Sequence, residues 1–305
     1  MNNSLSYLHP GGKFLVAIMV CIFSSVVFSL IGFLLSPLLF DITINEAFAA
    51  INGELDIQIS GFLKLNQAFQ SFGLFVFPAI VLGYMYTTDG ENYIGYKTKV
   101  PNYIYLLVIA SVITMIPFIN YTGAVNQQID LPDFMSGIEN SMKRLQESSM
   151  DMQSKLLFTE SYVGLIVNIL LIGVLPALGE ELLFRGIMQR TLSEFFKNHH
   201  IGILVTSVGF AAMHLQFYTF IPLFIFGVYF GYLFYWTKTI WVPILAHFVN
   251  NTTAVILHYM HEQGKISANP EEIGTSLSEG FMYILPGLLL SLIFVYMVYN
   301  KSQNR

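Results

Sequence analysis

Residues 162–186 read YVGLIVNILLIGVLPALGEELLFRG, an apolar run that ends in two adjacent glutamates and an arginine. Carboxylates have no ordinary structural reason to follow a run that is apolar enough for a membrane. A charged side chain at bilayer depth costs about 2.5–3.5 kcal/mol even on the mildest scale, so ionisable groups at that depth usually mark a functional site. Glu180, Glu181 and Arg185 are therefore the first candidate site residues.

The composition around this stretch is typical of a membrane protein. Apolar residues make up 54% of the 305-residue chain and charged residues only 11%, whereas soluble domains carry about 25% charged residues. The mean hydropathy is +0.61. A bilayer is spanned by about 20 apolar residues. We expect an all-α polytopic membrane protein with about eight transmembrane helices, over residues 14–39, 67–86, 103–119, 162–178, 201–215, 217–236, 240–260 and 281–299.

The lysines and arginines indicate the orientation, because loops rich in these residues stay in the cytoplasm. With eight spans and a cytoplasmic N-terminus, nine of the 14 basic residues fall on the inside, and the opposite orientation reverses this bias. We therefore expect both termini in the cytoplasm. The nine residues are Lys13, Lys97, Lys99, Arg185, Arg190, Lys197, Lys238, Lys301 and Arg305.

The charge and the cysteine content exclude several classes of protein. The net charge of −5 comes with no basic tract, so we expect no nucleic-acid partner. The single cysteine, Cys21, excludes a disulfide framework within the chain and a cysteine zinc site. Cys21 lies inside the first expected span, and we interpret it as a core residue.

The ionisable residues divide the chain into three regions. Residues 1–160 form an N-terminal transmembrane region, residues 161–262 a catalytic core, and residues 263–305 a loop and a C-terminal transmembrane helix. Within the first region, residues 135–157 have apolar side chains at helical spacing. We expect an amphipathic helix there, which lies on the membrane surface or caps the bundle. A solvated acidic loop helix is the alternative.

The two glutamates cannot share one task. Neighbouring residues on a helix point about 100° apart, whereas residues four apart share a face. Glu181 is thus expected to pair with Arg185, which leaves Glu180 free to act as a general base on water. The mirror interpretation makes Glu181 catalytic and lets Glu180 cap nearby backbone.

Two later apolar segments each carry a histidine, in Phe210-Ala211-Ala212-Met213-His214 and His247-Phe248-Val249-Asn250-Asn251. Peptide hydrolysis needs a base, a group that holds the water, and donors for the developing oxyanion. His214 can hold the water with Glu180, with Phe210 packed against its ring, and His247 and Asn251 can donate to an oxyanion. Each histidine or asparagine alone could simply join helices, but their joint occurrence with the glutamates favours a hydrolytic site.

These motifs resemble those of the CAAX protease and bacteriocin-processing family, the glutamate-dependent intramembrane endopeptidases that include the type II CAAX prenyl protease. Its Glu-Glu-x-x-x-Arg, Phe-x-x-x-His and His-x-x-x-Asn motifs occur here in order, within residues 164–259. The resemblance implies a peptidase of the bacterial inner membrane that cuts a membrane-associated protein or peptide, prenylated or otherwise processed. It also implies catalytic or supporting roles for Glu180, Glu181, Arg185, Phe210, His214, His247 and Asn251.

A metal is the minority alternative for this site. A catalytic zinc takes three protein ligands, which Glu180, His214 and His247 could supply. No His-Glu-x-x-His pair is present, and Asn251 one turn from His247 suits an oxyanion pocket better than a coordination sphere. We therefore expect no required cofactor.

Two other functions fit the same residues. A non-proteolytic membrane scaffold or a bacteriocin-resistance (immunity) protein could retain the site for binding, although no motif residue is lost. A proton-coupled transporter could use the same side chains as a relay, but the chain lacks the two matching halves with broken helices that mark many transporters. The residues indicate no particular substrate sequence or oligomeric state.

Overall fold

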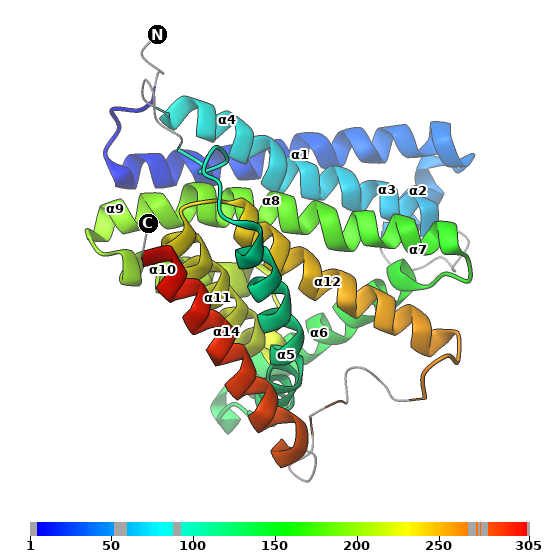
Figure 1. Ribbon diagram of the computed structural model, residues 1–305. Helices are drawn as coiled ribbons and strands as arrows, with labels where there is room; N and C mark the ends of the chain where they lie inside the picture. The colour runs from blue at the N-terminus through cyan, green and yellow to red at the C-terminus, as the bar shows by residue number, and fades with distance from the viewer. Residues whose placement is uncertain are drawn as a thin grey trace.

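The computed structural model describes residues 5–51, 60–87, 93–267, 273, 275 and 280–303, and these residues form helices and loops without strands (Figure 1). This confirms the all-α class. The first half contains α1 (Pro10–Phe40), α2 (Ile44–Ile51), α3 (Ser60–Ser71), the π-helix η2 (Phe72–Val76), α4 (Phe77–Tyr86), α5 (Asn102–Gln127), the 3-10 turn η3 (Asp133–Met135) and α6 (Ser136–Leu157).

The second half begins with one long interrupted helix. It comprises α7 (Tyr162–Asn168), the π-helix η4 (Ile169–Val174), α8 (Leu175–Leu183), the π-helix η5 (Phe184–Gln189) and α9 (Arg190–Phe196). Then follow α10 (His199–Met213), the 3-10 turn η6 (Phe217–Thr219), α11 (Phe220–Thr237), α12 (Trp241–Glu262), the π-helix η7 (Gly280–Ile284) and α14 (Leu285–Gln303).

Six helical stretches of the described residues are long and apolar enough to cross a membrane. Of the remaining expected spans, α10 is a shorter apolar helix. Helix α12 carries His247, Asn250 and Asn251 in its middle, which lower its hydropathy. The number of eight spans therefore stays a prediction. The six stretches are Pro10–Phe40, Gly61–Tyr86, Asn102–Gln127, Tyr162–Phe196, Phe217–Thr237 and Met282–Gln303.

Helix α1 shows why this chain belongs in a bilayer. Its large apolar side chains point outward, with Leu15, Met19 and Phe23 exposed by 63%, 67% and 72%. Small or polar residues face the protein instead: Ala17, Cys21, Ser24, Gly32 and Ser36 are buried. Small residues let transmembrane helices approach closely, and hydroxyl groups join them. The burial of Cys21 agrees with its expected place in the core.

The helix that carries the glutamates is longer than the sequence analysis predicted. The expected span ended at residue 178, but the helix continues without a break from Tyr162 to Phe196. The charged residues after 178 lower the local hydropathy although the backbone remains helical. Glu180 therefore lies near the middle of this helix.

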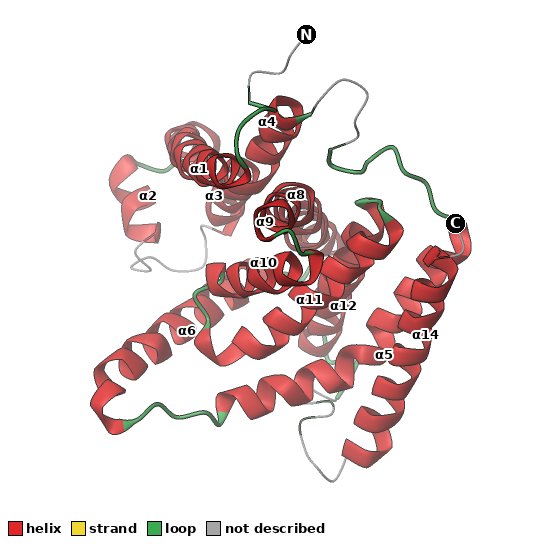
Figure 2. Ribbon diagram, turned by 90° about the vertical axis from the view of Figure 1, so that its left-hand side faces the viewer, coloured by secondary structure: helices red, strands yellow, loops and turns green. Residues whose placement is uncertain are grey.

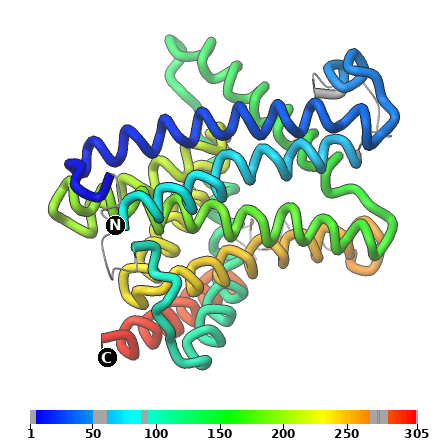
Figure 3. The backbone as a smooth tube through the Cα atoms, turned by 90° about the horizontal axis from the view of Figure 1, so that it is seen from above, coloured from blue at the N-terminus to red at the C-terminus, as the bar shows by residue number. Residues whose placement is uncertain are grey.

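Helices α8 and α9 lie between the two halves of the bundle, as the end-on view of α8 in Figure 2 shows. On one side run α1 and α3–α4, side by side with the long helix in Figure 3. Their shared core includes Ala17, Leu82, Tyr86, Leu183 and Ile187. On the other side, α5, α11, α12 and α14 enclose a second core. Because helices from both sides of residue 160 share one core, the division into regions at residues 160 and 262 stays a prediction.

Helix α6 confirms the helix expected at residues 135–157. It contacts α3, η6 and α12, and of its residues only Gln146 is buried. Glu139 and Lys143 form an ion pair of 2.6 Å one turn apart on its surface. The Lys143 ammonium also lies 5.9 Å from the ring centre of Tyr218 in η6. Helix α6 is thus attached to the loop that follows His214.

Candidate active site

The predicted site residues come from three elements that converge. Glu180, Glu181 and Arg185 lie on α8 and η5, Phe210 and His214 at the end of α10, and His247 and Asn251 on α12. Rings connect the three elements: Phe210 on α10 lies 5.2 Å from Phe184 on η5 and 6.1 Å from His247 on α12, between ring centres.

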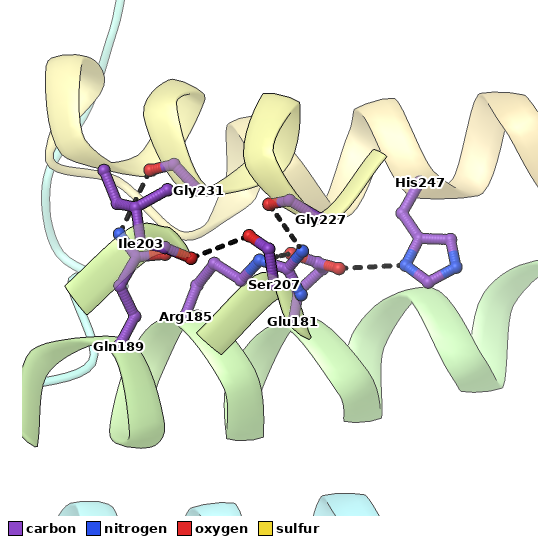
Figure 4. A network of polar contacts seen from close by, with 8 residues as sticks. All are labelled: Glu181, Arg185, Gln189, Ile203, Ser207, Gly227, Gly231 and His247. Carbon is purple, nitrogen blue, oxygen red and sulfur yellow. Dashed lines mark hydrogen bonds and ion pairs between the residues drawn. The ribbon is translucent and has the colours of Figure 1, made fainter. Parts of the chain in front are cut away.

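Glu181 is the centre of a buried ion network (Figure 4). Arg185 Nε lies 3.0 Å from Glu181 Oε2, which confirms the expected pairing one helical turn apart. The other carboxylate oxygen, Oε1, lies 2.9 Å from His247 Nδ1. An ionised carboxylate only accepts hydrogen bonds, so His247 Nδ1 carries a proton. This bond fixes the imidazole ring and leaves Nε2 on the side away from Glu181.

Arg185 is buried among aromatic rings. Its guanidinium lies 4.7 Å from the ring centre of Phe210, 5.4 Å from that of Phe230 and 5.9 Å from that of Phe184. It also donates from Nη2 to the Gly227 carbonyl at 3.2 Å. Cations over aromatic faces gain on the order of 2 kcal/mol when desolvated. Arg185 is therefore held in place and balances the charge of Glu181.

Glu180 has a different environment from Glu181, as expected for neighbouring residues on a helix. Its side chain is only 7% exposed. Its Oε2 atom accepts no hydrogen bond from the described residues. Glu180 is thus a buried carboxylate with an oxygen that the described residues leave without a hydrogen bond, next to the ion pair of Glu181 and Arg185.

The rings of Phe210 and His214 contact each other as predicted. Their centres are 5.3 Å apart in an edge-to-face arrangement. His214 is the residue that ends α10, and its side chain is partly exposed. Within the described part of the chain, its imidazole makes no hydrogen bond to the protein, so both ring nitrogens can serve a ligand.

Asn251 has a contact that the sequence analysis did not predict. Its side-chain amide donates to the Ile172 carbonyl in η4 at 3.0 Å. Pro176, four residues after Ile172, has no N–H to offer that carbonyl, because proline lacks the backbone donor of a regular helix. One of the two amide hydrogens of Asn251 therefore stabilises the π-helix. The other remains for an oxyanion.

Sequence reasoning missed four further residues of this network. Gln189 donates to the Gly231 carbonyl at 3.1 Å, and Gly227 and Gly231 supply the carbonyls that hold Arg185 and Gln189. Phe230 stacks on His247 with ring centres 5.1 Å apart. A signal for Gln189 existed, since it follows Glu181 and Arg185 at four-residue spacing on one helix face.

The donor set does not favour a metal. In the part of the chain that the structure describes, no three His, Cys, Asp or Glu side chains are close enough to hold a metal ion. The alternative zinc ligands Glu180, His214 and His247 are therefore not arranged around one position. In addition, one nitrogen of His247 already binds Glu181. Independence from metal stays a prediction.

Comparison with known proteins agrees with the resemblance in the motifs. Residues 162–253 match the family model described as type II CAAX prenyl endopeptidase Rce1-like. This segment holds all seven predicted site residues. The chain is also 33% identical over 88 residues to the uncharacterized protein YpbD of Bacillus subtilis (strain 168). That match covers 28% of this chain and 42% of YpbD, so the chain spans less than half the length of this relative. No solved structure matches the chain.

Proposed function

Since residues 162–253 are similar to the Rce1-like type II CAAX prenyl endopeptidases, we propose that this integral membrane protein is an intramembrane endopeptidase in which Glu180 activates water. One observation carries the proposal. A buried glutamate with an unused carboxylate oxygen lies in the middle of an apolar helix, beside the paired Glu181, Arg185 and His247.

The proposed reaction assigns each step to a group of this chain. Glu180 accepts a proton from water as the water oxygen attacks the peptide carbonyl carbon. His214 holds that water together with Glu180. His247 and the free amide hydrogen of Asn251 donate to the oxyanion that forms. The proton then passes from Glu180 to the amine that leaves as the peptide bond breaks.

The proposed assignment implies a balanced set of charges in the site. To donate from Nε2 while Nδ1 donates to Glu181, His247 must carry both ring protons. Two carboxylates, Glu180 and Glu181, then face two cations, Arg185 and His247. Buried charges are tolerated when they are paired, and this set sums to zero before the reaction begins.

The proposed substrate is a membrane-associated protein or peptide, prenylated or otherwise processed. The burial of Glu180 near the middle of its helix supports a reaction inside the bundle and away from bulk water. The bilayer is thus the expected environment of both enzyme and substrate. We further propose a location in the bacterial plasma membrane.

The deciding experiment compares the purified wild type with Glu180→Gln on a library of quenched fluorescent membrane peptides. Loss of the general base should reduce the cleavage rate by about 10²–10⁴-fold. Glu147→Gln, an exposed change on α6, is the matched control and should cleave like the wild type. Cleavage should also survive a chelator.

Three outcomes would contradict parts of the proposal. Equal cleavage by Glu180→Gln would remove Glu180 as the base. Cleavage lost with chelator and restored by zinc would establish the metal alternative. A folded wild type that cleaves none of the peptides, including prenylated ones, would favour the non-proteolytic scaffold or immunity function.

A further inference from the structure

Helices α10 and α11 cross at two glycines, Gly227 and Gly231, which lie one turn apart on α11. A methyl group on Gly227 would lie 2.9 Å from Ser207 Cβ and 3.1 Å from Ser207 Cα on α10. A methyl group on Gly231 would lie 2.8 Å from Ile203 Cγ2 on α10 and 2.9 Å from Gln189 Oε1 on η5. Carbon atoms do not approach so closely, so any larger residue here would push α10 away from α11.

The same two glycines expose their carbonyls to the helix of the active site. Figure 4 shows Glu181, Arg185 and Gln189 on one face of α8 and η5, directed toward α11. Arg185 donates to the Gly227 carbonyl at 3.2 Å and Gln189 to the Gly231 carbonyl at 3.1 Å. The four-residue spacing of the two donors thus matches that of the two acceptors. Each glycine therefore lets α10 approach closely, because it has no side chain. Its carbonyl accepts a hydrogen bond from η5.

This crossing controls the position of several site residues at once. Arg185, held by the Gly227 carbonyl, binds Glu181, and Glu181 binds His247. Helix α10 carries Phe210, whose ring lies 4.7 Å from the Arg185 guanidinium, and ends at His214. A displacement of α10 would therefore move both the arginine clamp and the second histidine.

We propose that Gly227 and Gly231 are positioning residues of the active site, which set the spacing of α10, α11 and η5 so that Arg185 and Gln189 bind the glycine carbonyls. The proposal rests on the peptidase function proposed above. It differs from simple helix packing in one respect: the glycines should matter for the chemical step more than for folding or substrate binding.

The experiment compares Gly227→Ala and Gly231→Ala with Gly209→Ala, which lies on α10 and has nothing within 4 Å of an added methyl group. A displacement of about 1 Å in a catalytic group can cost about 100-fold in rate. The added methyl group should displace α10 and the site residues that it carries by a similar distance. We therefore expect kcat per folded molecule to fall by about 100-fold in both α11 variants. KM should stay unchanged, and Gly209→Ala should behave like the wild type.

A second substitution tests the cause. Ile203→Ala removes the atoms of α10 that the Gly231→Ala methyl would strike, while Gln189 Oε1 stays 2.9 Å from that methyl. The double variant should therefore recover part of the kcat that Gly231→Ala loses, with Ile203→Ala alone as the reference. If the α11 variants yield less folded protein but the folded fraction has a normal kcat, the glycines serve ordinary packing and the proposal is overturned. A fall in kcat that Ile203→Ala does not relieve would overturn it as well.

A readout without substrate separates this proposal from the proposed function. The 15N spectrum of the histidine side chains, with His247 assigned through His247→Gln, reports the bond from His247 Nδ1 to Glu181. Gly227→Ala and Gly231→Ala should shift the His247 signals, and Gly209→Ala should not. Unchanged His247 signals in both α11 variants would reject the positioning role, whether or not the wild type cleaves peptides.

Discussion

Arg185 shows at the scale of one residue how this protein keeps charge in an apolar interior. Its side chain is 1% exposed, and it contacts Glu181, the Gly227 carbonyl and the face of Phe210. No lysine could make these contacts together, because an ammonium group lacks the planar fork of a guanidinium. The Glu-Glu-x-x-x-Arg spacing predicted the ion pair, since residues four apart share a helix face.

Replacement of Arg185 by Met should destabilise the protein strongly. Removal of one partner of a buried ion pair costs about 3–5 kcal/mol, because the other charge stays buried without compensation. The unfolding free energy in detergent, measured by denaturant titration, should fall by this amount. The double variant Glu181→Leu with Arg185→Met should be more stable than Arg185→Met alone. A single variant as stable as the wild type would contradict the view that the pair is tightly coupled.

The π-helices show at the scale of one element how prolines shape the site. Pro78 and Pro176 each stand just after a π-helix, at the start of α4 and α8. A proline within a helix removes one hydrogen bond and crowds the carbonyl four residues earlier. In η4 the amide of Asn251 binds this carbonyl, that of Ile172. The contact could not be predicted from sequence, because it joins two helices whose relative register only packing determines.

A double-mutant cycle tests this account of Asn251. Hydrogen bonds between transmembrane helices average about 0.6 kcal/mol, so Asn251→Ala should lower the unfolding free energy by about that much. Pro176→Ala restores a backbone N–H to the helix and should reduce the effect of Asn251→Ala. Equal losses in both backgrounds, measured by the same denaturant titration, would show that the Ile172 contact does not stabilise the helix.

The pH dependence of α6 provides a test outside the membrane spans. The hydrogen bond from Lys143 holds the pKa of Glu139 below its ordinary value. A lowered pKa in the folded state means that the pair stabilises α6 above the ordinary glutamate pKa and is lost as the pH falls through the folded value. A spin label at Ser141 should therefore become more mobile on acidification. Glu139→Gln should remove this pH dependence, and a transition that persists in Glu139→Gln would assign it to another group.

At the scale of the whole molecule, one end of the bundle gathers basic residues. Lys13 at the start of α1 lies 3.8 Å from Glu194 at the end of α9. Arg190 lies over the ring of Tyr93, and the amide of Ile240 donates to the Gly95 carbonyl. The start of α1, the end of α9, residues 93–96 and the link from α11 to α12 thus meet at this end. This end lies on the left of Figure 1, at the label of α9.

The positive-inside rule predicts that this basic end faces the cytoplasm. The test uses a Cys21→Ala background, which removes the native thiol, and a membrane-impermeant maleimide on intact cells. A cysteine that replaces Lys197, which is exposed just after α9, should be labelled only after the cells are opened. A cysteine at Ser141, exposed on α6, should be labelled from outside. The reverse pattern would invert the orientation.

The sequence by itself determined the membrane class, the three motifs and the contacts within single helices. Glu181 with Arg185 and Phe210 with His214 are pairs four residues apart, and the helical period places such pairs on one face. The tertiary structure alone decided the bonds from His247 to Glu181, from Asn251 to Ile172 and from Arg185 to Gly227. These bonds depend on how helices cross and slide along one another, which close packing at small residues determines and no local periodicity records.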